Sequence, residues 1–234
     1  MAMSRNSQIM LSVCGIAASV VFSLLVIVAG TQYAGYSHMT QAISELGGVD
    51  AARPLIQNAN FFIAGVLIVA FTIGLHRSLG SRLSAVGASL VGAFGLVLVA
   101  HAFLPCDSGC EFVSTVGSVH NVTGLAGFLS AIAGVFLMSR AFSVDPNWKS
   151  CRVYSVVTAV AGLASLVLWI VLAKAVRIQI LNGVLQRVFA ATIFMWIEVV
   201  AVRLFVLSRR AAMISPAAPP EDWSDQRPAL VRQP

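Results

Sequence analysis

Three of the four histidines in this chain lie beside long apolar segments, where an imidazole can do chemistry. His101 is near the end of the third such segment, His120 directly precedes the fourth, and His38 follows the first. At the boundary between an apolar phase and water, an imidazole can exchange a proton near neutral pH. His120 is therefore the candidate catalytic base, with Ser44 as candidate nucleophile and Glu45 as a further catalytic candidate. The alternative is an interfacial His120 that is hydrogen-bonded to water.

Two cysteines, Cys106 and Cys110, lie four residues apart in the segment between His101 and His120. A disulfide is one interpretation, because a loop can bring their Cα atoms within about 4.4–6.8 Å. A metal site that also uses Asp107 and the two histidines is the other, since these residue types suit zinc. Their spacing, however, matches no standard zinc motif. The sequence predicts no cofactor and leaves both interpretations of the cysteines open.

A second kind of candidate site is built around Arg187, which precedes the last apolar segment. Its planar guanidinium suits a lipid phosphate, and Lys174 and Arg177 add positive charge nearby. Asn58 and Asp107 are further binding candidates from loops expected at the same side of the molecule. These residues predict a site for a lipid headgroup. The alternative is that Arg187 only anchors the end of its helix.

Glu198 is the one acidic residue deep within an apolar segment. It follows Arg187 by three helical turns, so the two share a helix face and lie about 16 Å apart. This spacing predicts a carboxyl group near mid-membrane, where acids are functional candidates and where ionisation is costly. The alternative is a protonated carboxyl that is hydrogen-bonded to a neighbouring helix.

The elements that position these residues are six apolar segments. Of the 234 residues, 58% are hydrophobic and 10% are charged, against about 25% charged in a typical soluble domain. Each segment can cross a hydrocarbon core about 30 Å thick. The sequence predicts an all-α, polytopic integral membrane protein with a bundle of six transmembrane helices at Ile9–Gly30, Asn58–Leu75, Leu83–Leu104, Val122–Phe142, Val153–Ala173 and Val188–Leu207.

The distribution of basic residues predicts the orientation. Eleven of the fifteen Lys and Arg residues fall on the side of the two termini, which predicts a cytoplasmic N- and C-terminus. We expect a cytoplasmic N-terminus at 1–8, a transmembrane domain at 9–208 and a disordered cytoplasmic tail at 209–234. The predicted location is the cell membrane, and specifically the inner membrane of a bacterium. The sequence contains no basic stripe with interleaved aromatic residues, so its positive charge does not indicate nucleic-acid binding.

Small residues lie four apart in the middle segments, a spacing that lets helix backbones approach closely. We therefore expect the third and fourth helices to form the tightly packed centre of the bundle. The pairs are Ala88 with Gly92, Gly127 with Ala131, and Ser130 with Gly134.

Three blocks of residues resemble a bacterial membrane family that is catalogued as domain of unknown function 998. The first block is the stretch 36–47, which contains Ile-Ser-Glu-Leu-Gly, and it continues with Asn58, Asn60, Phe61 and Gly65. The second is Phe103-Leu104-Pro105-Cys106-Asp107, followed by Gly117 and His120. The third is Gly183 with Gln186, Arg187 and Trp196. The chain departs from the family pattern at Leu104 and in its paired cysteines. The first block is also remotely similar to DRAM-like membrane proteins.

The resemblance implies a membrane protein but no reaction. The first functional hypothesis is an integral membrane protein that binds a lipid or lipid headgroup at an extracytoplasmic polar pocket. The alternatives are a membrane-embedded hydrolase or transferase that acts on lipids, and a small proton-coupled transporter that uses Glu198. Membrane lipids are the expected partners. A homo-oligomer or a protein partner is left open.

Overall fold

Six long helices form the protein, as the apolar segments predict. The computed structural model describes residues 5–175 and 179–214, which contain helices and no strand. All six helices are long and apolar enough to cross a membrane. They are α1 (Arg5–Thr31), α2 (Pro54–Leu79), α3 (Arg82–His101), α4 (Thr115–Val144), α5 (Cys151–Trp169) and α6 (Asn182–Ile214).

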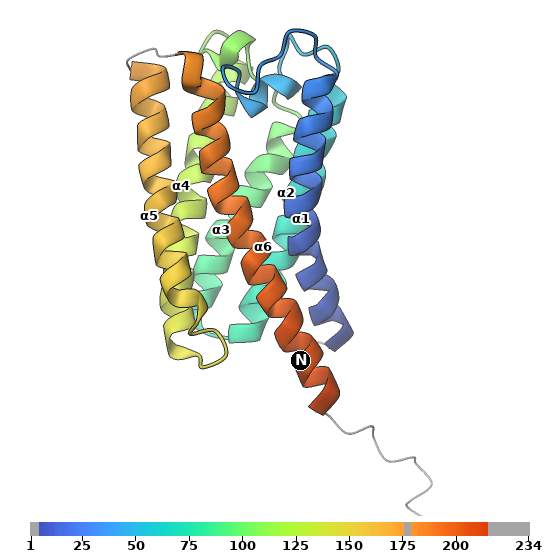
Figure 1. Ribbon diagram of the computed structural model, residues 1–234, viewed down its shortest axis with the longest axis vertical. Helices are drawn as coiled ribbons and strands as arrows, with labels where there is room; N and C mark the ends of the chain where they lie inside the picture. Colours follow the sequence, from blue (N-terminus) through green and yellow to red (C-terminus); the bar gives the residue numbers. More distant parts are fainter. Residues whose placement is uncertain (1–4, 176–178, 215–234) are drawn as a thin grey trace, which may run out of the picture.

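The two ends of the bundle differ (Figure 1). One end, called the loop end here, carries the longer connections and their short helices, η1 (Ile43–Gly47), η2 (Ser108–Cys110), η3 (Ile170–Ala175) and η4 (Gln179–Leu181). The other end, called the terminal end, carries the start of α1, the end of α6 and two short turns. The candidate catalytic residues all belong to the loop end.

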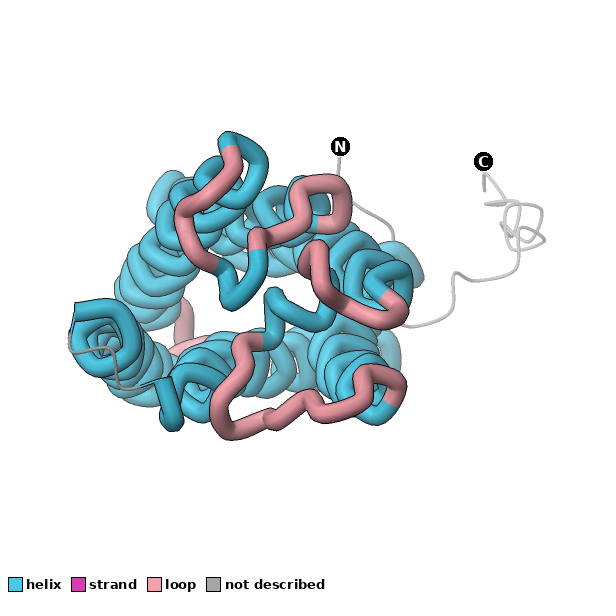
Figure 2. The backbone as a smooth tube through the Cα atoms, turned by 90° about the horizontal axis from the view of Figure 1, so that it is seen from above, coloured by secondary structure: helices cyan, strands magenta, loops and turns pink. Residues whose placement is uncertain are grey.

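The helices are arranged as a ring. Each helix packs against the next one in the chain, and α6 closes the ring by packing against α1. The view from above shows this ring, with the loop segments lying across its end (Figure 2). Large side chains such as Phe71, Ile68 and Trp196 are fully buried between the helices. A ring of six helices leaves room in its middle that two packed layers would not.

Close contacts between helix backbones are made at glycines. A Cβ atom on Gly65 of α2 would collide with the carbonyl oxygen of Gly95 on α3, and one on Gly134 of α4 would lie 2.8 Å from the carbonyl oxygen of Gly87. Ser130 of α4 donates to the carbonyl oxygen of Leu90 at 2.8 Å. The third and fourth helices are thus closely packed, as expected. They do not form the centre of the bundle, however, because each helix occupies one place in the ring and α2 packs on α3 just as closely.

Helix α4 begins about two turns earlier than the predicted Val122. Ser114 caps it by accepting a hydrogen bond from Gly117 N at 3.0 Å, and such a cap stabilises a helix start even in polar sequence. The apolar pattern alone does not reveal these turns, because residues 115–121 are partly polar. The earlier start places His120 and Asn121 within the helix instead of at its beginning.

The two ends of the chain extend the helices. Helix α1 already begins at Arg5, within the predicted N-terminal segment, and α6 continues to Ile214, beyond residue 209 where the tail was predicted. The remainder of that tail, and Arg177, lie outside the described residues.

Candidate functional site

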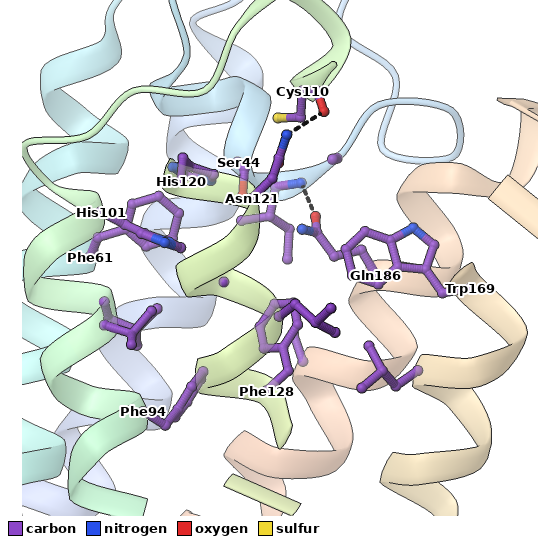
Figure 3. A pocket seen from close by; sticks show the side chains of 18 of the residues that line it. Ser44, Phe61, Phe94, His101, Cys110, His120, Asn121, Phe128, Trp169 and Gln186 are labelled. Carbon is purple, nitrogen blue, oxygen red and sulfur yellow. Dashed lines mark hydrogen bonds between the residues drawn. The ribbon is translucent and has the colours of Figure 1, made fainter. Parts of the chain in front are cut away.

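A cavity of about 290 Å³ lies inside the ring, in its loop-end half (Figure 3). Its size is at the lower limit of small-molecule sites, which run from about 300 to 1,000 Å³. Most of its wall is apolar and aromatic, with contributions from Phe22, Phe61, Phe94, Phe128, Trp169 and Phe194. No Lys, Arg, Asp or Glu is among the described residues that line it. The cavity therefore suits an apolar, uncharged occupant.

Two histidines form part of its polar end. The rings of His101 and His120 stack with centroids 3.9 Å apart and planes inclined by 18°. Both residues line the cavity, and they are 5% and 4% exposed. Thus two histidines separated by the whole loop between α3 and α4 are brought face to face by the antiparallel packing of these helices.

Hydrogen bonds assign the proton of each neutral ring. His120 Nδ1 lies 2.6 Å from the carbonyl oxygen of Leu104, which only accepts, so Nδ1 carries the proton and Nε2 has a free lone pair. His101 Nε2 lies 3.1 Å from Thr123 Oγ1, whose own proton goes to the carbonyl oxygen of Val119. His101 Nε2 is therefore the protonated nitrogen. Each ring keeps one nitrogen that can accept a hydrogen bond or a proton.

Ser44 also lines the cavity, but its hydroxyl makes no hydrogen bond to His120 or to any other described residue. A serine nucleophile is activated by a direct hydrogen bond to its base. Asn121, beside His120, donates its amide to the carbonyl oxygen of Cys110 at 3.0 Å (Figure 3). The structure brings Ser44 and His120 into one cavity without the contact that would make them a catalytic pair.

Two amides on α6 complete the polar end, and sequence reasoning did not single them out as a pair. Asn182 Oδ1 accepts a hydrogen bond from Trp169 Nε1 at 2.8 Å, and Gln186 Oε1 accepts one from Ile43 N. Both amides line the cavity and are 3% and 5% exposed. The spacing of four residues at the start of an apolar helix was the available signal.

Arg187 does not line this cavity; it fastens the first loop to α6. Its Nη1 donates to the carbonyl oxygens of His38, Gln41 and Gly183, each within 2.9 Å. Its Nη2 donates to the Tyr36 hydroxyl at 2.6 Å and contacts His38 Nδ1 at 3.0 Å. Arg187 and His38 instead line an adjacent groove of about 330 Å³ between α1 and α6, which shares Phe22, Ile43, Ala190 and Phe194 with the cavity wall.

The charge of Arg187 affects the titration of its loop partners. Partial burial lowers the pKa of His38, and the nearby guanidinium lowers it further. Burial raises the pKa of Tyr36, although Arg187 opposes this shift. Both His38 and Tyr36 are therefore neutral around pH 7, so they solvate the guanidinium as neutral groups.

Two further predicted site residues shape the first loop. A carboxylate oxygen of Glu45 accepts a hydrogen bond from Ala42 N at 2.6 Å and so caps η1. Asn58 packs against Gly47, where its side-chain oxygen is buried and has no hydrogen-bond partner. Neither Glu45 nor Asn58 lines the cavity.

Asp107 organises the second loop. Its carboxylate accepts hydrogen bonds from Ser114 N at 2.8 Å, Ser114 Oγ at 2.7 Å and Val113 N at 3.1 Å. Cys106 and Cys110, on either side of it, are bonded as a disulfide with Cα atoms 5.0 Å apart. Bonded sulfurs are not thiolate ligands. Among the described residues, no three His, Cys, Asp or Glu side chains lie close enough together to hold a metal ion.

We expect Asp107 to make the stability of this loop depend on pH in the acidic range. The hydrogen bonds from Ser114 hold its pKa below the usual value, so its contribution is present above about pH 4 and is lost as the pH falls through the lower, folded-state value. Thermal unfolding of the detergent-solubilised protein between about pH 6 and pH 3 should show a smaller acid-induced loss for Asp107→Asn than for wild type. The exposed Asp50→Asn is the matched control. An acid dependence that Asp107→Asn leaves unchanged would contradict this role.

Glu198 does not line the cavity, although it follows the lining residue Phe194 by one helical turn of α6. Trp196, two residues earlier, donates to Ser155 Oγ at 2.8 Å in the second turn of α5, and Arg203 donates to the carbonyl oxygen of Asn147 in the turn before α5. Glu198 lies two residues from the middle of the span Asn182–Arg210, and its position near mid-membrane stays a prediction. Among the described residues it has no hydrogen-bond or ion-pair partner.

The cavity comes close to the outer surface of the bundle between α4 and α5. Leu125 of α4 and Ile170, directly after α5, line it and are also 41% and 39% exposed. Phe112, in the loop above them, lines it and is 63% exposed. Leu125 and Ile170 belong to the spans that are apolar enough to cross a membrane. At this place, therefore, exposed side chains form part of the cavity wall.

Comparison with known proteins identifies a family whose model matches this chain. The sequence profile of the family described as "Protein of unknown function (DUF998)" matches residues 16–203, which include α2 to α5, most of α1 and α6, and all the described residues of the cavity wall. No curated protein and no solved structure matches the chain.

Proposed function

Since the chain belongs to the DUF998 family, whose description assigns no activity, we propose a function from the cavity: the protein binds one membrane lipid in it. The single observation that carries this proposal is an aromatic, uncharged cavity with a polar end, enclosed by helices of transmembrane length.

The surroundings of the cavity favour an occupant that comes from the bilayer. Its wall at Leu125 and Ile170 is apolar and exposed, and it belongs to two segments that are apolar enough to span a membrane. A water-soluble ligand would have to cross the loops at the loop end, where Cys110 and Ile43 lie over the cavity. A lipid chain can move between α4 and α5 without leaving an apolar phase.

The polar end of the cavity favours an uncharged lipid over an anionic headgroup. The guanidinium of Arg187, the residue expected to bind a phosphate, already donates to three backbone carbonyls and to the Tyr36 hydroxyl. His101 and His120 offer neutral acceptors instead. An uncharged lipid is also less costly to bury where no ion pair can form.

The proposal takes the protein to lie in the cell membrane with both termini in the cytoplasm, as the positions of Lys and Arg predict. The loop end and its cavity then face the outer leaflet. Lipids of that leaflet are the proposed partners.

The proposal is tested by filling the cavity. Ala190 of α6 lines it, so a phenylalanine at this position should displace the occupant. Native mass spectrometry of the protein, purified in mild detergent, should show one lipid copy on wild type and at least about a tenfold lower occupancy on Ala190→Phe.

Ala126→Phe is the matched control, because Ala126 is exposed on α4 and does not line the cavity. Ala126→Phe should keep the lipid, and both variants should keep the unfolding temperature of wild type. A wild-type protein without bound lipid, or equal occupancy in Ala190→Phe and wild type, would exclude the cavity as a lipid site.

A further inference from the structure

Asn182 and Gln186 lie four residues apart on α6, so their amides project from one helix face. From these two amides we infer that the cavity recognises its occupant through a carbonyl oxygen, and that the occupant is an uncharged, ester-bearing lipid. This inference rests on the proposed lipid binding and names the chemical class of the lipid.

The orientation of each amide follows from its protein partner. The indole N–H of Trp169 and the backbone N–H of Ile43 can only donate, so each must face an amide oxygen. The oxygens of Asn182 and Gln186 are thereby assigned, and their NH₂ groups are the remaining ends. Figure 3 shows the Gln186 side chain between the backbone that it accepts from and the ring of Trp169.

Neither NH₂ group has a hydrogen-bond partner among the described residues, although both residues are more than nine-tenths buried. The two nitrogens are not among the side-chain atoms that are fully enclosed without a partner, which are Gln57 Nε2, Asn58 Oδ1 and Asn60 Oδ1. Both residues line the cavity, so the cavity is the space from which their NH₂ groups can be reached. An occupant with an acceptor there satisfies donors that the described residues leave unpaired.

The chemistry of that acceptor is restricted by the rest of the wall. Among the described residues, no basic side chain lines the cavity to neutralise a carboxylate or phosphate, and burying an unpaired anion is far more costly than burying a neutral carbonyl. An ester carbonyl accepts from NH₂ donors without charge, and its acyl chain can lie along the ring of Phe128 and the side chain of Leu125. A neutral acylglycerol has these features.

The test compares two probes that differ only in the carbonyl group. Monodecanoylglycerol has an ester carbonyl, and decylglycerol ether lacks it. Binding of each to the detergent-purified full chain is measured by titration calorimetry. Wild type should bind the ester about tenfold more tightly than the ether.

The variants Asn182→Asp and Gln186→Glu keep an oxygen that accepts from Trp169 or Ile43. Binding is measured at about pH 9, so that the new carboxyl group is ionised and offers no donor in place of the NH₂ group. Each should weaken binding of the ester about tenfold and change binding of the ether by less than about twofold. With carbonyl-labelled ester, the infrared carbonyl band should lie at lower wavenumber on wild type than on either variant, since hydrogen bonding weakens the C=O bond.

The outcomes separate this inference from the function on which it rests. If wild type binds ester and ether equally, or if the variants weaken both equally, the carbonyl inference is wrong while lipid binding stands. If wild type binds neither probe and Ala190→Phe has the lipid content of wild type, the proposed function fails as well. An unshifted carbonyl band on wild type overturns the inference even where the affinities differ.

Discussion

Gly65→Ala should destabilise the bundle by about 2–3 kcal/mol, and Gly65→Val should prevent correct assembly. The Cβ atom would meet the carbonyl oxygen of Gly95 and, at 2.8 Å, a methyl group of Val99. A backbone oxygen cannot rotate away as a flexible side chain can. Relief of the collision therefore requires α2 and α3 to move apart along their shared interface.

Gly162→Ala of α5 is the control for this prediction. The nearest atom to its Cβ would be 3.5 Å away, which is an ordinary contact, so the better helix propensity of alanine should leave stability unchanged or raise it by up to about 1 kcal/mol. The measurement is thermal unfolding in detergent, followed by circular dichroism. Equal unfolding temperatures for Gly65→Ala and Gly162→Ala would show that α2 and α3 are not in backbone contact.

The second large effect is expected at Arg187. Its guanidinium is the main polar link between the first loop and α6, because it donates to the carbonyl oxygens of His38 and Gln41 and to the Tyr36 hydroxyl. Arg187→Ala removes these bonds and leaves their acceptors half-buried, which should cost about 2–4 kcal/mol. The unfolding temperature should fall, and protease should cleave within residues 32–53 far faster than in wild type.

Arg187→Lys separates geometry from charge. An ammonium group keeps the charge but cannot reach several acceptors with a planar fork, so it should recover less than half of the lost stability. Arg152→Ala, which removes an exposed arginine at the terminal end, is the control and should leave loop cleavage unchanged. Loop cleavage at the wild-type rate in Arg187→Ala would contradict the fastening role.

The role of Arg187 also changes how a loss of lipid binding is interpreted. Ile43, in the loop that Arg187 fastens, donates to Gln186 and lines the cavity. Arg187→Ala can thus lower lipid occupancy by releasing the loop, with no direct contact between guanidinium and lipid. Asn182→Asp and Gln186→Glu leave that fastening in place, so they report on recognition itself.

The transmembrane architecture can be derived from the sequence by itself. Apolar runs long enough to cross a bilayer must become helices there, because the lipid offers no partner for backbone N–H and C=O groups. The number of helices and the position of the central part of each helix follow from this constraint alone. Helix ends are different: α4 begins at Thr115 because Ser114 and Asp107 satisfy its first N–H groups, a local effect that apolar periodicity does not contain.

The tertiary structure decided which of the candidate residues line the cavity. The residue types of His120, Ser44, Arg187 and Glu198 all indicate chemistry, yet only His120 and Ser44 line the cavity. A polar residue at the end of a helix can face the interior of the ring, a loop or the lipid, and its position in the chain does not distinguish these. Rotation and tilt of each helix arise from packing between helices distant in sequence. The same packing stacks His101 on His120 and leaves the amides of Asn182 and Gln186 without protein acceptors among the described residues.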